Sequence, residues 1–150
     1  MKARFIGLLK ILAQVCLCAV LIFVVARAQI SHGQKPEADG TDQSIKLADA
    51  IMLARRADVL FLDVRSRGFF SRGHIKGAVN LPLTEMNEVT IAVVVRDHAN
   101  IVVYCDGQTC LAGPQAVNLL RKHPRLNVML YRGGWNEWLS LDFPIERGQL

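Results

Sequence analysis

The chain has 150 residues, a length that fits one domain together with a targeting segment. Its formal charge of +5 overstates the charge of the folded part, because four of the 18 Lys and Arg residues precede residue 29, and the rest carries 14 basic against 13 acidic residues. A nearly neutral domain lacks the basic face that nucleic-acid binding requires, so no nucleic-acid partner is expected.

Residues 1–28 have the pattern of a targeting segment. Basic residues precede an apolar run from residue 11 to residue 26, and small residues flank Arg27. Cleavage after Ala28 would make the segment a signal peptide, whereas uncleaved residues 5–26 would be long enough to span a membrane. Because basic residues at the start favour a cytoplasmic N-terminus, the domain is expected to be exported. In a bacterium it would be either anchored in the inner membrane with the domain in the periplasm, or soluble in the periplasm.

Residues 29–44 show no periodicity and are typical of a linker, which leaves residues 45–150 as the globular part. Apolar residues at helical spacing predict helices over 47–54, 89–95 and 115–122. Short apolar runs predict strands over 59–62, 77–81, 101–104 and 128–131. Because these strands are apolar on both faces, we expect an open, mostly parallel α/β sheet with helices on both faces and a ligand site at the carboxyl ends of its strands.

Cys105 lies where the apolar run 101–104 ends and a small polar loop begins. A helix is expected beyond the loop, so backbone N–H groups can converge near the sulfur and stabilise a thiolate. This position favours a reactive cysteine, and the alternative is a small buried residue at the end of a strand. The remaining cysteines and the histidines lack the spacing of metal ligands, so no metal site is expected.

Four motifs, taken in order and spacing, resemble the rhodanese-like domain of the single-domain sulfurtransferases. They are Leu62-Asp63-Val64-Arg65, Gly73-His74-Ile75-Lys76-Gly77-Ala78-Val79-Asn80-Leu81-Pro82, Val103-Tyr104-Cys105 and Gly133-Gly134-Trp135. The resemblance covers about residues 45–147. It implies an open parallel sheet of about five strands flanked by helices on both faces. It also implies that the loop after the fourth strand presents a cysteine that carries sulfur.

The first two motifs are expected to be structural. Asp63 and Arg65 should pair with each other or with the turn from Gly73 to Gly77, and so hold the scaffold. His74 is expected to be a hydrogen-bonded turn residue rather than a general base.

Two further features bear on the helices near the loop, namely the last motif and Pro114. Gly133 and Gly134 should permit a tight strand-to-helix turn, after which Trp135 is expected to be a packing residue. Pro114 is tolerable if it falls in the first turn of its helix, where a missing N–H costs little.

The resemblance implies sulfur transfer in two steps on Cys105. Its thiolate takes the outer sulfur of a small donor, and a thiol, a cyanide-like nucleophile or a protein acceptor then removes that sulfur from the persulfide. No cofactor is expected. Backbone N–H groups of the loop should cradle the donor or the persulfide. The loop residues are Asp106, Gly107, Gln108, Thr109, Cys110 and Leu111.

The loop lacks the basic residues that attract thiosulfate in better-known sulfurtransferases. Asp106 should instead repel an anionic donor and disfavour the thiolate. Thiosulfate is therefore not assured as the donor, although Arg65, Arg67 or Arg132 could approach from neighbouring loops.

Cys110 leaves further interpretations open. In an oxidising compartment it could resolve a persulfide or a sulfenic acid on Cys105 through a disulfide within the loop, which would suit a thiol-disulfide redox module. It could equally be a buried cysteine at the start of the helix. A further alternative is a non-catalytic rhodanese-like module that binds another protein.

Overall fold

The computed structural model describes residues 44–148. The targeting segment expected over 1–28, and the predicted linker except for Ser44, lie outside these residues. Among the described helices, none is long and apolar enough to cross a membrane. Ser44 itself begins the first strand rather than ending the linker.

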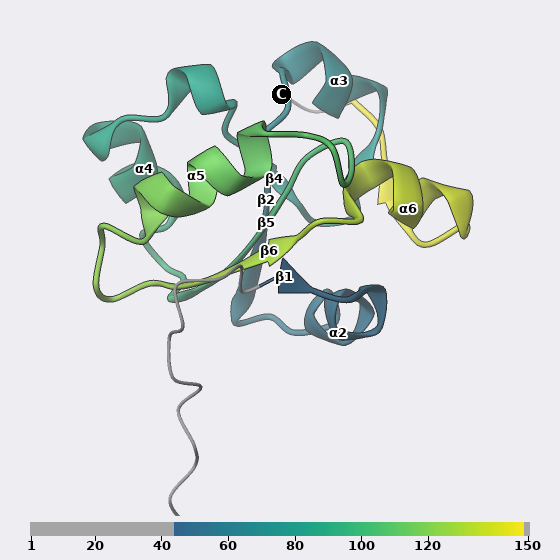
Figure 1. The fold of residues 1–150 in the computed structure, drawn as a ribbon, viewed down its shortest axis with the longest axis horizontal. Coiled ribbons are helices and arrows are strands. Elements are labelled where there is room, and N and C mark those ends of the chain that lie inside the picture. Colours follow the sequence, from purple (N-terminus) through teal and green to yellow (C-terminus); the bar gives the residue numbers. More distant parts are fainter. Residues whose placement is uncertain (1–43, 149–150) are drawn as a thin grey trace, which may run out of the picture. The chain divides into compact units, whose positions relative to one another are not determined.

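Five parallel strands form the main sheet, in the order β1-β6-β5-β2-β4 (Figure 1). They are β1 (Ser44–Ile45), β2 (Val59–Asp63), β4 (Val79–Asn80), β5 (Asn100–Tyr104) and β6 (Asn127–Tyr131). Their last residues lie opposite one another in the register: Ile45, Tyr131, Tyr104, Asp63 and Asn80. All five strands therefore end at one edge, and the loops that follow them meet there.

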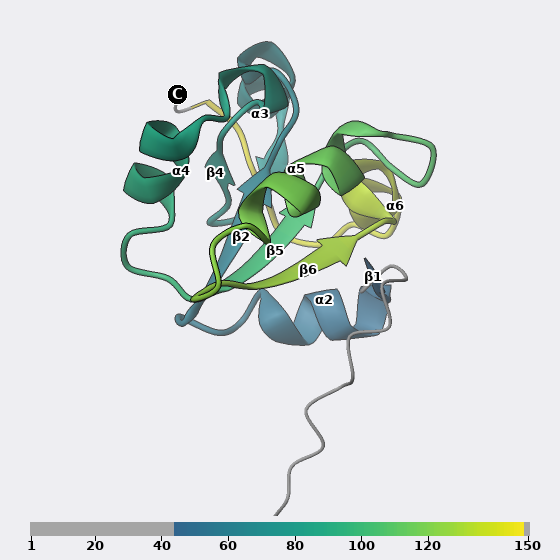
Figure 2. The same ribbon diagram turned by 60° about the vertical axis from the view of Figure 1, so that its left-hand side comes forward.

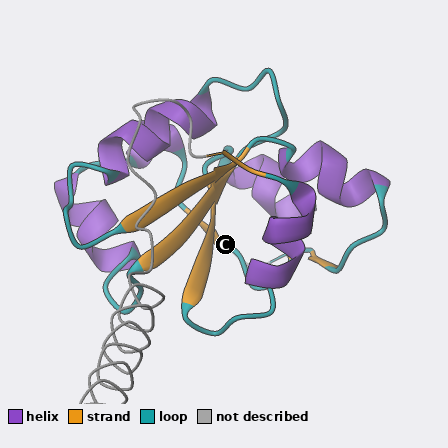
Figure 3. Cartoon of the chain, turned by 60° about the horizontal axis from the view of Figure 1, so that its bottom comes forward, coloured by secondary structure: helices purple, strands orange, loops and turns teal. Residues whose placement is uncertain are grey.

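Helices cover both faces of this sheet, as expected (Figures 2 and 3). α4 (Glu88–Val94) and α5 (Ala112–Leu120) pack on one face, while α2 (Leu47–Leu53) and α6 (Gly134–Ser140) pack on the other. Alternation along the strands supplies both cores, because successive side chains point to opposite faces. In β5, Val103 joins the core under α4 and α5, whereas Val102 joins the core under α2 and α6.

Two predicted helices are present with shifted bounds. The helix expected over 89–95 is α4, and it forms despite its β-branched residues because the side chain of Asn87 accepts hydrogen bonds from the N–H groups of Val89 and Thr90. The helix expected over 115–122 is α5, which begins at Ala112, so Pro114 lies in its first turn. The sequence predicted a later start for this helix, because its first residues, Ala112, Gly113 and Pro114, are small and show no apolar period.

Several elements have no counterpart in the sequence prediction. α3 (Arg67–Arg72) is too short to show a helical period, and η1 (Leu83–Glu85) is a single 3-10 turn. β3 (His74–Ile75) pairs antiparallel with β7 (Ile145–Glu146), far along the chain. The strand predicted over 77–81 is reduced to β4, because the chain turns at Gly77, where φ is +77°.

Candidate active site

Cys105 directly follows β5 at the edge where the five strands end. Its residue is 5% exposed, and Tyr104 before it is fully buried. We call residues 105–111 the site loop. This loop connects β5 to α5, and Leu111, 71% exposed, is the N-cap residue of α5. The sequence-based position of Cys105, at the carboxyl end of a central strand, matches the structure.

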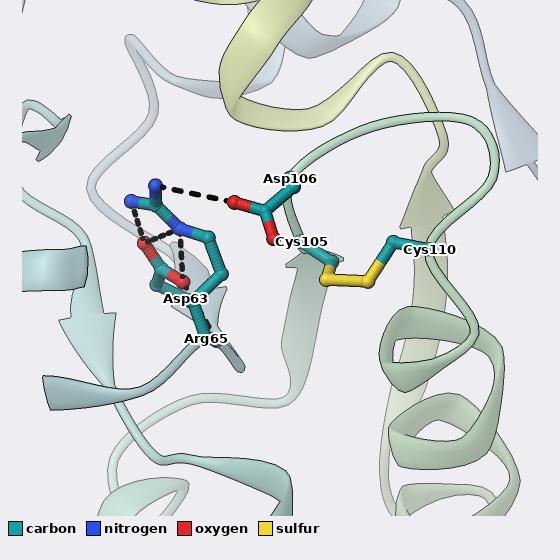
Figure 4. Close-up of a disulfide and its surroundings, with 5 residues drawn as sticks. All are labelled: Asp63, Arg65, Cys105, Asp106 and Cys110. Atoms are coloured by element: carbon teal, nitrogen blue, oxygen red, sulfur yellow. Dashed lines mark hydrogen bonds and ion pairs between the residues drawn. A yellow bond between two sulfur atoms is a disulfide. The ribbon is translucent and has the colours of Figure 1, made fainter.

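Cys105 and Cys110 form a disulfide, with their Cα atoms 6.4 Å apart (Figure 4). A turn within the loop brings them together, since the N–H of Cys110 donates to the carbonyl of Gly107 at 3.0 Å. Cys105 is buried, whereas Cys110 is only partly buried. The pairing of the two cysteines, which the sequence left open, is thus formed in this structure, and Cys110 is its more accessible half.

The start of α6 holds the site loop through backbone hydrogen bonds. The N–H groups of Trp135 and Asn136 donate to the carbonyls of Cys105 and Asp106, both at 2.8 Å. Gly134 permits this approach, because its φ is +60° and a Cβ at this position would collide with the Cys105 carbonyl oxygen. The tight turn expected at Gly133 and Gly134 is present.

These bonds orient the carbonyls of the loop and leave several of its N–H groups available. Among residues 44–148, the N–H groups of Gly107, Gln108 and Thr109 donate to no backbone carbonyl. A hollow of about 430 Å³ lies along this part of the loop. Its lining is Asp106, Gly107, Gln108, Thr109, Cys110, Gly133, Asn136 and Glu137. Of the predicted cradle residues, Leu111 alone is not part of this lining. An anion or a polarised sulfur in the hollow therefore lies beside residues whose N–H groups donate to no backbone carbonyl within the described part of the chain.

Asp63 and Arg65 form a buried ion pair beneath the loop. The Arg65 Nη2 donates to Asp63 Oδ2 at 2.6 Å and to the carbonyl of Gly73 at 2.8 Å. Burial alone would lower the pKa of Arg65, but the hydrogen bonds and charge of Asp63 outweigh burial and raise that pKa. Both expected contacts, between the pair and with the following turn, are present.

Arg65 also links this pair to the site loop. Its Nη1 lies 3.7 Å from Oδ1 of Asp106 (Figure 4). Its guanidinium lies 4.9 Å from the ring centre of Trp135. Trp135 is thus a packing residue as expected, and it packs on the cation. Arg67, another arginine considered for the loop, pairs instead with Glu85. The charge of Asp106 is therefore partly compensated by a cation from a different strand end.

A second hollow, of about 290 Å³, shares Asp106 and Asn136 with the first. Arg65, Arg72 and Arg147 contribute to its lining, and the last two are exposed. No carboxylate of residues 44–148 forms an ion pair with Arg72 or Arg147. Sequence reasoning missed both arginines, because one ends α3 and the other follows β7, and neither position is near the loop in sequence.

His74 is held away from the site loop by contacts with other parts of the domain. Its Nδ1–H donates to the carbonyl of Phe70 at 2.9 Å, and its ring stacks on that of Phe70 at 3.7 Å. Its Nε2 lies 3.8 Å from Glu146, whose carboxylate also accepts the N–H of Gly77 at 3.1 Å. His74 lines neither hollow beside the loop, and its contacts fit the expected structural role.

One group of side chains in the described part of the chain could hold a metal ion. The ligand atoms of Cys105, Asp106 and Cys110 lie within 4.8 Å of one another. Because the two sulfurs are bonded to each other, this group offers thiolate ligands only after reduction.

Comparisons with known proteins agree with this geometry. The family model described as "Rhodanese-like domain" matches residues 46–141. An HTH-type transcriptional regulator of Mycobacterium tuberculosis is 30% identical over 131 residues, which cover 85% of this chain and 57% of that protein. The chain therefore spans little more than half of this relative.

Two solved structures are similar. The rhodanese-like domain of an Anabaena protein is 26% identical with a TM-score of 0.57, and the match covers 71% of this chain and 80% of that domain. A human single-domain sulfurtransferase is also 26% identical, with a TM-score of 0.52, over 67% of this chain and 97% of that protein.

Proposed function

Because the chain belongs to the rhodanese-like domain family, we propose that it is a sulfurtransferase that carries sulfur as a persulfide on Cys105. The observation that carries the proposal is the position of Cys105 directly after β5, at the start of a loop with unpaired N–H donors. A small sulfur donor and a nucleophilic acceptor are its partners. Similarity to a human single-domain sulfurtransferase supports the same chemistry.

The reaction begins from the reduced loop, since the disulfide occupies the nucleophile. The Cys105 thiolate attacks the outer sulfur of the donor, the donor's S–S bond breaks, and the leaving group keeps the electron pair. An acceptor then attacks the outer sulfur of the persulfide and returns Cys105 as a thiolate. The N–H groups of Gly107, Gln108 and Thr109 are available to stabilise the terminal persulfide sulfur.

An anionic donor is compatible with this site despite Asp106. Arg65 partly offsets the charge of Asp106, and Arg72 and Arg147 add positive charge to the hollow that Asp106 also lines. The arginines outnumber the one carboxylate in this lining, and an excess of positive charge attracts an anion and raises its rate of encounter with the site. Thiosulfate therefore belongs among the donors to be tested.

The test is a loading experiment on the reduced protein. The protein is treated with thiosulfate or with inorganic polysulfide, separated from the donor by gel filtration, and mixed with cyanide. Sulfur is then measured as thiocyanate plus sulfide per protein. We expect to recover sulfur from the wild type and from Cys18→Ser, and no sulfur from Cys105→Ser. Equal recovery from Cys105→Ser would exclude this function.

A thiol-disulfide redox module is the second candidate, and the Cys105–Cys110 disulfide favours it. Such a module would exchange electrons with other thiols without taking up sulfur. The two functions differ in mass, since a persulfide adds a sulfur atom to the loop whereas oxidation removes two hydrogens. A non-catalytic binding module would show neither change, and its Cys105 would react slowly even after reduction.

We also propose that the domain is exported, either anchored through residues 5–26 or released by cleavage after Ala28. The basic and apolar pattern of the first 28 residues supports export, and a disulfide in the loop suits an oxidising compartment. Cell fractionation and the N-terminal mass of the native protein test this placement. An intact N-terminus in the soluble cytoplasmic fraction would contradict it.

A further inference from the structure

We propose that Cys110 is a second catalytic residue, which discharges the persulfide on Cys105 and releases its sulfur as hydrogen sulfide. This inference rests on the proposed function and names the fate of the sulfur. The protein would then act as a dithiol-dependent, sulfide-releasing enzyme, in addition to passing sulfur to an external nucleophile.

The disulfide shows that the two sulfur atoms can meet in the folded loop. In the persulfide the inner sulfur is Sγ of Cys105, the atom that Cys110 bonds in this structure. The Cys110 thiolate attacks this inner sulfur, the bond to the outer sulfur breaks, and the outer sulfur leaves as HS⁻ with the electron pair. The products are the Cys105–Cys110 disulfide and one hydrogen sulfide ion, so atoms and electrons balance.

The internal attack by Cys110 has an advantage over the attack of an external acceptor. Cys105 is 5% exposed, which restricts an approaching nucleophile, whereas the turn from Gly107 to Cys110 holds the second thiol beside it. Holding two reacting groups together replaces an encounter in solution with an intramolecular reaction. An external acceptor must reach the outer sulfur before Cys110 reaches the inner one.

The unequal burial of the two cysteine residues also determines which of them a reductant attacks when it regenerates the dithiol. A dithiol reductant attacks the more accessible Cys110, which forms a mixed disulfide with it, and Cys105 leaves as a thiolate. The second thiol of the reductant then attacks the mixed disulfide, which frees Cys110 and oxidises the reductant. Each turnover therefore consumes one dithiol and yields one hydrogen sulfide.

The experiment follows a single turnover in the full chain. Reduced protein is loaded with inorganic polysulfide, freed of donor and reductant by anaerobic gel filtration, and sampled over time. Each sample is alkylated and digested with trypsin. Both loop cysteines fall in one tryptic peptide, residues 97–121, which excludes Cys16 and Cys18. The mass of this peptide, the masses of its fragments, which show which cysteine carries the added sulfur, and the sulfide in solution are measured together.

We expect the wild-type peptide to lose the added sulfur and gain the disulfide as an equal amount of sulfide appears. In Cys110→Ser, and in Cys110→Ala as a second variant, the persulfide should persist on Cys105 and sulfide release should slow at least about tenfold. Cys18→Ser, which removes a thiol outside this peptide, should behave as the wild type.

Two results would overturn the inference. One is sulfide release from the Cys110 variants at the wild-type rate, and the other is sulfur that moves to Cys110 in the wild type and stays there. Failure of the proposed function has a different signature, because the peptide would then take up no sulfur in any of the proteins, and the inference would fall with it.

Discussion

The Arg65 guanidinium bridges two carboxylates, with Asp63 on its own strand end and Asp106, 3.7 Å away, beside Cys105. This bridge connects the buried scaffold to the site loop. It also changes the electrostatic argument about the donor, because the negative charge of Asp106 lies against a cation rather than in isolation.

Asp106→Asn should speed the loading of Cys105 by thiosulfate, within about tenfold, because one negative charge beside the sulfur is removed while Asp63 keeps Arg65 in place. Stopped loading reactions at several thiosulfate concentrations measure the rate. The gain should shrink as salt is added, since screening weakens the interaction of exposed charges. Asp97→Asn is the matched control, because Asp97 precedes β5 at its opposite end. A slower reaction of Asp106→Asn would contradict this account.

Arg65→Ala should lower the free energy of unfolding by about 3 to 5 kcal/mol, because it leaves the buried carboxylate of Asp63 without its cation. Urea unfolding of the reduced protein measures this change. Arg65→Lys should recover only part of the loss, since an ammonium cannot reproduce the paired bonds of the guanidinium. Arg56→Ala, which breaks an exposed ion pair with Asp58, serves as control and should change stability little. Equal effects of the two alanine variants would refute the structural role of Arg65.

Gly134→Ala should destabilise the protein and displace the site loop, because its Cβ would collide with the Cys105 carbonyl and its φ is +60°. Gly77→Ala separates these causes, since Gly77 has a φ of +77° but open space around its Cβ position. The left-handed conformation alone costs about 1 to 2 kcal/mol. The free energy of unfolding, measured with urea, should therefore be lower for Gly134→Ala than for Gly77→Ala. Sulfur loading should fall only in Gly134→Ala. Equal losses of stability in the two variants would show that backbone strain, which both share, dominates over the close approach of α6.

Reduction should lower the free energy of unfolding of the wild type by about 2 kcal/mol, as the loop-entropy relation gives for so short a loop. The comparison is urea unfolding with and without a phosphine reductant. Cys110→Ser lacks the disulfide, so reductant should leave its stability unchanged. If wild type and variant respond alike, the loop cysteines are not paired in solution.

Stability should fall as the pH rises above about 10, the usual pKa of tyrosine. Burial and the hydrogen bond to Glu137 raise the pKa of Tyr131, and burial with the nearby charge of Asp63 raises that of Tyr104. A raised pKa in the folded state means that the unfolded chain loses its proton first, so this stability is present below about pH 10 and is lost above it. Urea unfolding across this range should show a smaller fall in Tyr131→Phe than in the wild type. An equal fall would mean that Tyr131 titrates normally.

The main sheet and the position of Cys105 were predictable because they depend on local pattern. Val59–Asp63 and Asn100–Tyr104 are continuous apolar runs of strand length, and such runs require cover on both faces. The antiparallel pair of β3 and β7 was not predictable, because His74 meets Glu146 across most of the domain and each strand has only two residues. Strands that short carry no period of their own.

The sequence by itself determined the fold class, the strand end that presents Cys105, the structural role of Asp63 and Arg65, and the turn at Gly133 and Gly134. Each of these depends on residues that are neighbours in the chain or on a motif of fixed spacing. Only the tertiary structure decided that Arg65 reaches Asp106, that Arg72 and Arg147 join the loop in one hollow, and that Cys110 is the more exposed partner in the disulfide. The contact of Arg65 with Asp106 follows from the common level at which the five parallel strands end, because neighbouring strand ends bring together loops that are far apart in the sequence. Arg147 is brought to the same region by the antiparallel pairing of β3 with β7.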